Sequence, residues 1–348
     1  MDFSIALILT QDGIVNGAVY VLLALALVLV FTVTRIIFIP QGEFVAFSAL
    51  TLAMLENGRF PGTVWLVLAG GLAVCAMEAG ALVARHDWRY RLQVLGWNLA
   101  YPLVLWALAA TIDWREAGQW GRIAFTLALI VPLGPMMFRV FFQPIASAPV
   151  LVLLIVAVAV HVALVGLGLW MFGAEGYRTL PLWDENFLVG PLRIPGQAVW
   201  VVGASVVLIV LLAQFFSRTI YGKALRATAV NRNGARLMGI SPNLAGRLTL
   251  MLAAAIGAVS GILVSPITTI YYDTGFLIGL KGFVAAIIGG LSAYPAAAAG
   301  ALLVGLLESF SSFWASAYKE VIVFTLIIPV LFWRSLRTHH VEEEEEEE

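Results

Sequence analysis

Long apolar stretches recur along nearly the whole chain, separated by shorter polar segments. A helix needs about 20 apolar residues to cross a bilayer core about 30 Å thick. Stretches of this length occupy residues 14–34, 63–84, 92–112, 120–142, 149–172, 197–216 and 247–267. Shorter apolar stretches lie at 43–55, 280–291, 296–313 and 320–333. Together they predict about 9–11 transmembrane helices, the short ones being half-helices or re-entrant segments.

Composition supports this membrane assignment. The 348 residues are 61% hydrophobic and 12% charged, whereas soluble domains carry about 25% charged residues. The apolar stretches also lack the period-two alternation of membrane barrel strands. We therefore predict an all-α polytopic membrane protein whose helices form one bundle over residues 1–340.

The charges near the N-terminus and the single cysteine add to this prediction. The only charges before the first apolar stretch are acidic, Asp2 and Asp12, whereas a signal peptide begins with a basic region; we expect no cleaved leader. The single cysteine, Cys75, lies inside an apolar stretch. It excludes an intrachain disulfide and a multi-cysteine metal site, and we expect a packing role for it.

Charges in the loops predict the orientation. Basic residues gather in cytoplasmic loops, and the loop 217–247 has no acidic residue but contains Arg218, Lys223, Arg226, Arg232, Arg236 and Arg247. Arg85, Arg89 and Arg91 mark a second cytoplasmic loop, and Arg334 and Arg337 place the C-terminus in the cytoplasm. The loop 173–196 carries charges of both signs and is expected on the periplasmic side. Seven consecutive glutamates at 342–348 predict a disordered acidic tail over 341–348.

The basic loop also carries a helical pattern. Gly222 opens a stretch rich in Ala, Leu and Arg, which are good helix formers. Gly239 and Pro242 end it. We expect one short helix from Gly222 to Gly239 with a small-residue face that includes Ala227. From the residues alone, it either docks in a groove of another protein or is a solvated positive loop.

Several blocks of sequence resemble a known family. They are the segment 219–241, Gly279-Leu-Lys-Gly-Phe-Val-Ala-Ala-Ile-Ile-Gly-Gly-Leu291, Gly305-Leu-Leu-Glu-Ser309 and, near the N-terminus, Arg35-Ile-Ile-Phe-Ile-Pro-Gln-Gly-Glu-Phe44. Together they look like the permeases of branched-chain amino-acid ABC importers, and the likeness covers most of residues 12–60 and 143–336. Residues 85–142 look like an insertion of about two helices.

The chain departs from the family pattern mainly within its membrane-embedded part. Pro40-Gln41-Gly42 stands where the family usually has Ala-His-Gly, and Gln143-Pro144-Ile145 stands where it has Arg-Pro-Leu. These departures leave the solute open between branched-chain amino acids and related small polar solutes such as amides, urea and small organic acids.

The resemblance implies the transport machinery. A second permease subunit, identical or different, would complete the path in the bacterial inner membrane. Two cytoplasmic ATPase subunits would bind ATP with Mg²⁺, and a periplasmic binding protein would deliver the solute. This chain would bind no cofactor, metal or nucleic acid. Its ATPase-coupling residues would be Gly222, Arg226, Ala227, Asn231, Arg232 and Gly239. In agreement, no G-x-x-x-x-G-K-[ST] phosphate-binding loop occurs in the sequence, so the chain is expected not to be an enzyme.

Polar residues at membrane depth are costly and therefore suggest function. Pro40 and Gly42 should break the helix around Gln41 and Glu43, and broken helices line a cavity or are buried in protein. Gln41, Gly42 and Glu43 accordingly either contact the solute or form a cytoplasmic turn. For Lys281 and Glu308, which can pair inside the bundle, and for His161 and Glu78, we expect structural roles.

Two other classes of protein share parts of this pattern. A secondary transporter or channel working alone explains the apolar pattern equally well, but it predicts inverted repeats with paired broken helices, and no convincing repeat is visible in the sequence. An intramembrane enzyme needs paired catalytic groups, and no Ser/His/Asp set or carboxylate pair has supporting context.

Overall fold

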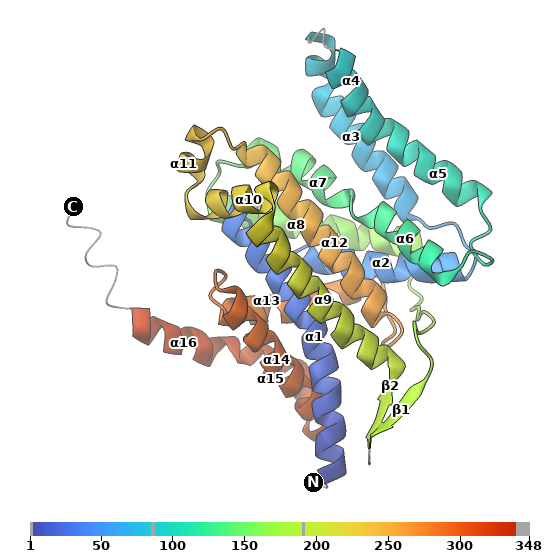
Figure 1. Cartoon of the computed structure of the whole chain (residues 1–348), viewed down its shortest axis with the longest axis vertical. Coiled ribbons are helices and arrows are strands. Elements are labelled where there is room, and N and C mark those ends of the chain that lie inside the picture. The colour runs from blue at the N-terminus through green and yellow to red at the C-terminus, as the bar shows by residue number, and fades with distance from the viewer. Residues whose placement is uncertain (1–2, 85–87, 190–191, 339–348) are drawn as a thin grey trace.

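A computed structural model describes residues 3–84, 88–189 and 192–338, which are almost entirely helical (Figure 1). The helices that follow one another along the chain are α1 (Phe3–Thr34), α2 (Gln41–Glu56), α3 (Thr63–Ala84), α4 (Trp88–Leu95), α5 (Tyr101–Thr111), α6 (Gln119–Ile130), α7 (Leu133–Met137), α8 (Val150–Phe172), α9 (Gly196–Arg218), α10 (Ile220–Val230), α11 (Arg232–Leu237), α12 (Pro242–Val264), α13 (Thr274–Ile288), α14 (Tyr294–Trp314), α15 (Lys319–Thr325) and α16 (Ile327–Thr338).

Short non-α elements complete the fold. Two π-helical segments, η1 (Gly96–Ala100) and η2 (Phe138–Phe142), continue α4 and α7, and two 3₁₀ turns are η3 (Gln143–Ile145) and η4 (Ser316–Tyr318). Strands β1 (Asn186–Val189) and β2 (Leu192–Pro195) form a small antiparallel hairpin before α9. The predicted acidic tail and Arg85 lie outside the described residues.

Seven helical stretches in the described part are long and apolar enough to cross a membrane, and Thr63–Ala79 and Thr274–Ile288 are shorter apolar helices. The predicted all-α polytopic class is therefore confirmed. Two of the four short predicted spans correspond to partial helices: α2 has 16 residues and α13 has 15, about 24 Å and 22 Å at 1.5 Å per residue. The other two lie in Tyr294–Trp314 and Ser316–Trp333, which are long enough to cross a membrane.

The first partial helix follows the break that the sequence predicted. α1 ends at Thr34, Arg35 has a left-handed backbone with φ 62°, and helical structure resumes only at Gln41, after Pro40. Proline cannot donate a backbone hydrogen bond inside a helix. The chain therefore turns back between α1 and α2, and α2 begins deep inside the bundle.

The C-terminal half repeats this arrangement with α12, a non-helical connection and α13. α2 runs parallel to α12, with Gln41 beside Ala253 and Ser48 beside Gly261. α13 runs parallel to α1, with Lys281 beside Tyr20. Helices α1 and α2 form one unit, and α12 and α13 form the other. Each half-helix thus packs along the long helix of the other unit.

The two half-helices meet at their N-terminal ends. A Cβ atom on Gly42 would lie 1.9 Å from the carbonyl oxygen of Gly275, and one on Gly275 would lie 2.5 Å from the carbonyl oxygen of Gly42. Only glycine leaves room for two backbones this close.

Each long helix is also crossed by an antiparallel helix through glycines. On α1, Gly13 faces Leu306 and Gly17 faces Leu302 of α14, and on α12, Gly246 faces Phe138 of η2 while Gly134 of α7 faces Leu250. Because α1 and α12 run in opposite directions (Figure 1), the two units form an inverted repeat. The structure therefore contains a repeat that is not visible in the sequence.

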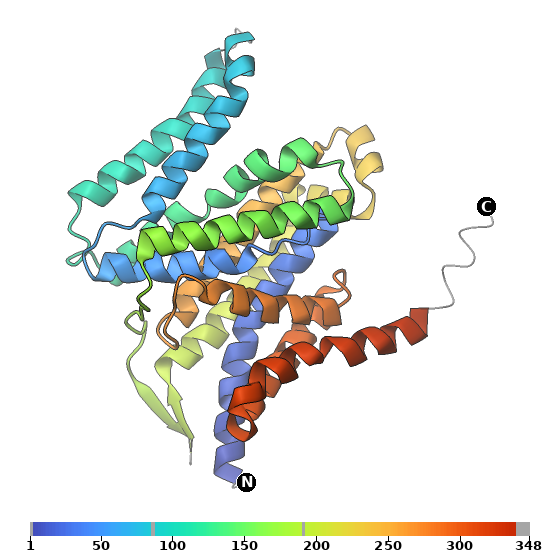
Figure 2. The same ribbon diagram turned by 180° about the vertical axis from the view of Figure 1, so that it is seen from behind.

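Helices α3–α5 form a hairpin that projects from the rest of the bundle (Figure 2). It leaves and returns at neighbouring points, since Arg115 donates to the carbonyl oxygen of Asn57 at 2.9 Å. The predicted insertion 85–142 does not form one structural unit, because α6 and α7 pack on α2 and α12 in the bundle whereas α4 and α5 lie beside α3.

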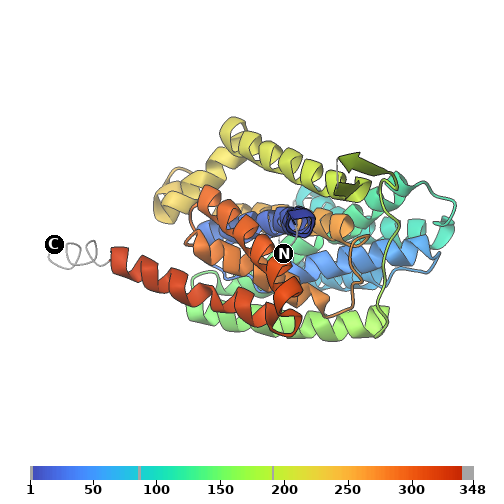
Figure 3. The same ribbon diagram turned by 90° about the horizontal axis from the view of Figure 1, so that it is seen from below.

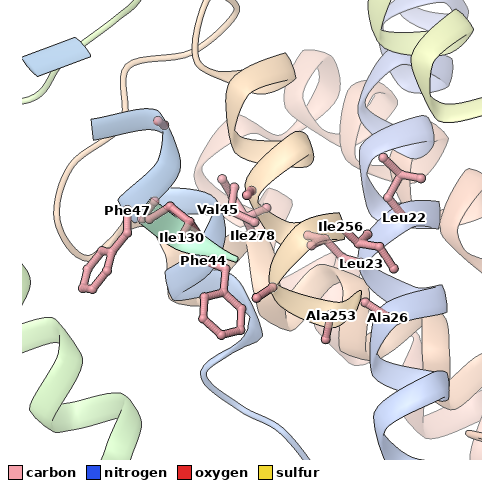
Figure 4. Packing of buried hydrophobic residues seen from close by; sticks show 14 of the residues in the cluster. Leu22, Leu23, Ala26, Phe44, Val45, Phe47, Ile130, Ala253, Ile256 and Ile278 are labelled. Atoms are coloured by element: carbon pink, nitrogen blue, oxygen red, sulfur yellow. The ribbon is translucent and has the colours of Figure 1, made fainter. Parts of the chain in front are cut away.

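The core lies between α1, α2, α12 and α13. Figure 4 shows side chains from these helices packing together, among them Leu23, Phe44, Ile256 and Ile278. α1 passes through the middle of the bundle (Figure 3), and 83% of its most apolar window is buried, against 11% for α9. The peripheral helices keep exposed apolar faces suited to lipid.

Candidate solute cavity and coupling segment

The segment Gln41–Glu43 is the deeply buried start of α2. Gln41 and Glu43 have no exposed surface, and the Gln41 side-chain amide donates to the Ala253 carbonyl oxygen at 3.0 Å. A cytoplasmic turn does not fit this burial. The segment also does not line the cavities described below, so in this conformation it is a packing joint, and solute contact there stays a prediction.

Glu43 and His161 form a pair that the sequence did not link. His161 Nδ1 lies 2.9 Å from Glu43 Oε1, and the imidazole stacks on the Phe276 ring with centroids 4.6 Å apart. The ring nitrogen of His161 meets a buried carboxyl, as a structural role requires, and that role stays a prediction. Glu78 likewise pairs with Arg139 of η2. Both contacts join residues more than 60 positions apart in the sequence, so local sequence patterns do not predict them.

A polar cavity of about 740 Å³ opens between α1, α13, α14 and α15. Its charged and amide lining residues are Asp12, Asn16, Lys281, Glu308, Lys319 and Glu320. Aliphatic side chains such as Val15, Val19 and Ile267 complete the walls. The cavity therefore offers both charged groups and apolar surface to a small molecule.

An ion-pair network forms one wall of this cavity. Lys281 Nζ lies 2.5 Å from Glu308 Oε1 and 3.2 Å from Glu320 Oε1. The Tyr20 hydroxyl donates to Glu308 Oε2 at 2.5 Å. Lys281 and Glu308 therefore pair inside the bundle, one of the two arrangements that the sequence allowed, and the network joins α13, α14, α15 and α1.

The cavity and the basic loop lie at different levels of the bundle. Lys281 lies beside Tyr20, and Leu29 and Val33 near the end of α1 pack against Leu225 of α10. Thirteen residues of helix separate Tyr20 from Val33, about 20 Å at 1.5 Å per residue. From Lys281 the cavity extends along α1 to Leu9, away from the loop.

The basic loop forms two helices and not the single predicted one. Thr219 caps α10 by accepting a hydrogen bond from Gly222 N at 2.9 Å. Asn231 has extended backbone angles and caps α11 by accepting from Gly234 N at 2.8 Å. Asn at an N-cap satisfies a free helix amide and favours a new start. Gly239 ends the segment with φ 83°, as the sequence predicted.

The exposed surface of this coupling segment, residues 219–241, carries large apolar side chains beside its basic ones. Tyr221, Val230, Leu237 and Met238 are 59–88% exposed. Between α10 and α11 lies a hollow of about 570 Å³, with Ala227 among its lining residues. Large exposed apolar groups of this kind mark contact surfaces. The sequence predicted a small side chain at Ala227, but it did not predict the large side chains nearby.

The two arginines predicted for coupling are engaged within the chain. Arg226 donates to the Phe216 carbonyl oxygen, and Arg232 donates to the Ala146 carbonyl oxygen at 3.0 Å. Arg232 thereby ties α11 to the connection before α8, where Gln143 and Pro144 border the same groove. These arginines therefore position the segment, besides giving it positive charge.

Comparison with known proteins identifies relatives along most of the chain. A family model described as "Branched-chain amino acid transport system / permease component" matches residues 9–331. The branched-chain amino acid permease protein BraD of Pseudomonas aeruginosa is 26% identical over 290 residues, covering 81% of this chain and 94% of BraD. LivH of Escherichia coli K12 is 27% identical over 293 residues, covering 80% and 92%. No solved structure matches.

Proposed function

The chain belongs to the permease family of branched-chain amino-acid transport systems, and on that premise we propose how it takes part in ATP-driven import. It forms part of the path for branched-chain amino acids or related small polar solutes through the bacterial inner membrane. A second permease subunit completes the path, two ATPase subunits bind its cytoplasmic face, and a periplasmic binding protein delivers the solute.

One observation carries the coupling role most strongly. The coupling segment exposes Tyr221, and it places the exposed side chains of Val230 and Met238 at the hollow that Ala227 lines. These side chains lie outside the apolar helices that contact lipid, so a protein partner is the occupant that removes them from water. An apolar side chain of an ATPase subunit fills the hollow, and the arginines supply long-range attraction.

The coupling segment connects to the helices to which it would transmit movement of the ATPase. Its ends continue into α9 and α12, and Leu225 packs against Leu29 and Val33 of α1. α1 and α12 are also the two long helices of the inverted repeat. A displacement of α10 and α11 by the ATPase therefore reaches both halves of the bundle, as coupling through one shared element requires.

The other partners follow from the same orientation. With the coupling segment in the cytoplasm, the polar cavity faces the periplasm and the C-terminus is cytoplasmic. The chain supplies no phosphate-binding loop, so ATP and Mg²⁺ belong to the ATPase subunits. The inverted repeat is also found in carriers that work alone, but the family match favours the importer subunit.

The test is Ala227→Trp, which fills the hollow. Overpacking of a formed contact costs about 1–3 kcal/mol, so ATPase binding should weaken about fivefold to 100-fold. Co-purification with the ATPase and uptake should fall together. Ala110→Trp, at an exposed alanine of α5, is the control and should bind normally. Normal ATPase binding and uptake by Ala227→Trp would refute docking at this face.

A further inference from the structure

An apolar crevice lies beside the coupling segment, between α1, the end of α9 and the start of α14. Both outer helices pack against α1, and the space between them measures about 410 Å³. The residues that line it include Leu25 and Leu29 of α1, Ile209, Ala213 and Phe216 of α9, and Tyr294 of α14. The crevice shares no lining residue with the polar cavity, so it is a second, separate place where a ligand can bind.

Polar groups of the crevice lie at the end of α9. Ser217 and Arg226 line the crevice there. Arg226 donates to the carbonyl oxygen of Phe216, and carbonyls in the last turn of a helix lack partners within the helix. This contact holds the guanidinium at the mouth of the crevice. A guanidinium has several N–H donors and Arg226 is exposed, so donors remain for a ligand.

Below its mouth the crevice is apolar. Phe216 and Ile209 are seven residues apart, about 10 Å along α9 at 1.5 Å per residue. Over this length the lining side chains of α9 and α1 are aliphatic or aromatic, ending at Ile209 and Leu25. The crevice is therefore charged at its mouth and apolar in its depth. A phospholipid has the same division, since its phosphate lies at the membrane surface and its acyl chains lie below.

The charges around the mouth favour one kind of headgroup. Arg218 and Lys223 are exposed and lie close to Arg226 in the chain, and no Asp or Glu occurs between residues 186 and 272. The acidic residue of α14, Glu308, lies 14 residues from the start of that helix, about 21 Å away. Basic pockets between transmembrane helices on the cytoplasmic side bind anionic lipid headgroups. Charge complementarity thus favours a lipid with net negative charge over a zwitterionic one.

We propose that this crevice binds one anionic phospholipid of the cytoplasmic leaflet, such as phosphatidylglycerol. Arg226 donates to the lipid phosphate, and one acyl chain lies between α1 and α9 against Leu25 and Ile209. Because Arg226 belongs to α10, the bound lipid joins the coupling segment to the helices of the bundle. This inference goes beyond the proposed function and shares with it only the cytoplasmic position of the coupling segment.

Native mass spectrometry of the full chain in detergent, which counts bound lipids, tests the proposal. The probes are phosphatidylglycerol and phosphatidylethanolamine with the same acyl chains, each titrated against delipidated protein. Arg226→Gln removes the charge at the mouth but keeps a donor for the Phe216 carbonyl. Arg236→Gln, in α11 and outside the crevice lining, is its matched control. Arg226→Lys keeps the charge.

A second pair of variants tests the apolar part of the crevice. Ala213→Trp fills it from an exposed position of α9. Val210→Trp places the same side chain at an exposed position of the same helix outside the lining, so it is the control for a bulky residue on α9.

Phosphatidylglycerol should bind at one saturable site about fivefold more tightly than phosphatidylethanolamine, the factor that one basic residue near an anionic headgroup supplies. Arg226→Gln and Ala213→Trp should each weaken this binding about fivefold or more. Arg226→Lys and both controls should bind nearly as well as the natural sequence.

Three results would overturn the proposal. Equal affinity for the two phospholipids would assign the crevice to bulk lipid. Unchanged binding by Arg226→Gln and Ala213→Trp would place the lipid elsewhere on the protein. Displacement of phosphatidylglycerol by an equal concentration of inorganic phosphate would assign the mouth to a free anion. The assay contains no ATPase subunit, so each of these results rejects the lipid site and leaves docking at Ala227 to its own test.

Discussion

Removal of the Lys281 charge should destabilise the bundle strongly, and neutralising Glu308 should restore it. Lys281 is 7% exposed and meets two carboxylates from α14 and α15. Lys281→Met keeps most of the side-chain volume but leaves both carboxylates without their cation. Breaking a buried ion pair by removing one partner costs about 3–5 kcal/mol. This cost corresponds to a change of about two to almost four orders of magnitude in the folded-to-unfolded ratio.

The second substitution tests whether charge causes the loss. Glu308→Gln removes one carboxylate and keeps an oxygen that accepts from Tyr20. The double variant Lys281→Met/Glu308→Gln should therefore regain most of the lost stability, leaving only Glu320, whose side chain is 33% exposed. Residues in one network are expected to be non-additive in this way. Lys319→Met, in the same cavity without an ion-pair partner in the described part of the chain, is the matched control.

The assay is the apparent melting temperature in detergent, followed by loss of monodisperse protein at one heating rate. In domains of 150–250 residues, 1 kcal/mol moves the midpoint by about 2–4 °C. Lys281→Met should therefore melt roughly 6–20 °C lower than the natural sequence. The control should change much less. Melting of Lys281→Met at the natural temperature, or a double variant no better than the single, would contradict the argument.

Four further predictions concern the joint at the start of α2 and the ATPase activity of the chain. Gly42→Ala places a Cβ 1.9 Å from the Gly275 carbonyl oxygen, so the yield of monodisperse protein should collapse; normal yield would show that the half-helices do not meet there. Gln41→Ala should remove the additional hydrogen bond to the Ala253 carbonyl and cost about 0.5–1.5 kcal/mol, whereas a specific change of uptake at unchanged stability would favour solute contact. Glu43→Gln keeps a hydrogen-bond partner for His161 and should alter uptake only if this carboxyl contacts the solute. The isolated chain should hydrolyse no ATP, measured as phosphate release, and robust hydrolysis would exclude the importer-subunit assignment.

The sequence predicted the features that depend on local chemistry. Apolar stretches about 20 residues long predict spanning helices because lipid offers no hydrogen-bond partner to an irregular backbone. The break near Gln41 was visible because Pro40 cannot support a continuous helix. Gly239 ended the coupling segment as expected because a left-handed residue favours glycine. The resemblance of several sequence blocks to a known family predicted the family, which the comparisons confirm.

The features that remained hidden depend on contacts between distant segments. In the sequence, Asn231 is predicted to lie inside a single helix. Its extended backbone in the structure shows that it caps a second helix. The inverted repeat has no visible sequence signal, because similar packing is achieved by different residues: Gly13 and Gly17 on one side, and Gly134 and Gly246 on the other. Helix contacts of this kind require small residues at matching places and not a repeated sequence.

In the candidate site, too, some features could be predicted from the sequence and others depend on contacts between distant segments. Lys281 and Glu308 were recognised as costly charges, since membrane depth makes any ionisable group expensive. Only the tertiary structure brought Tyr20, Lys319 and Glu320 to the same cavity, because these residues come from helices at opposite ends of the chain. It also showed that Gln41 and Glu43 are fully buried, and solute contact at these residues stays a prediction. Local patterns therefore determined which residues are polar in the membrane, whereas long-range packing decided which of them meet and which face open space.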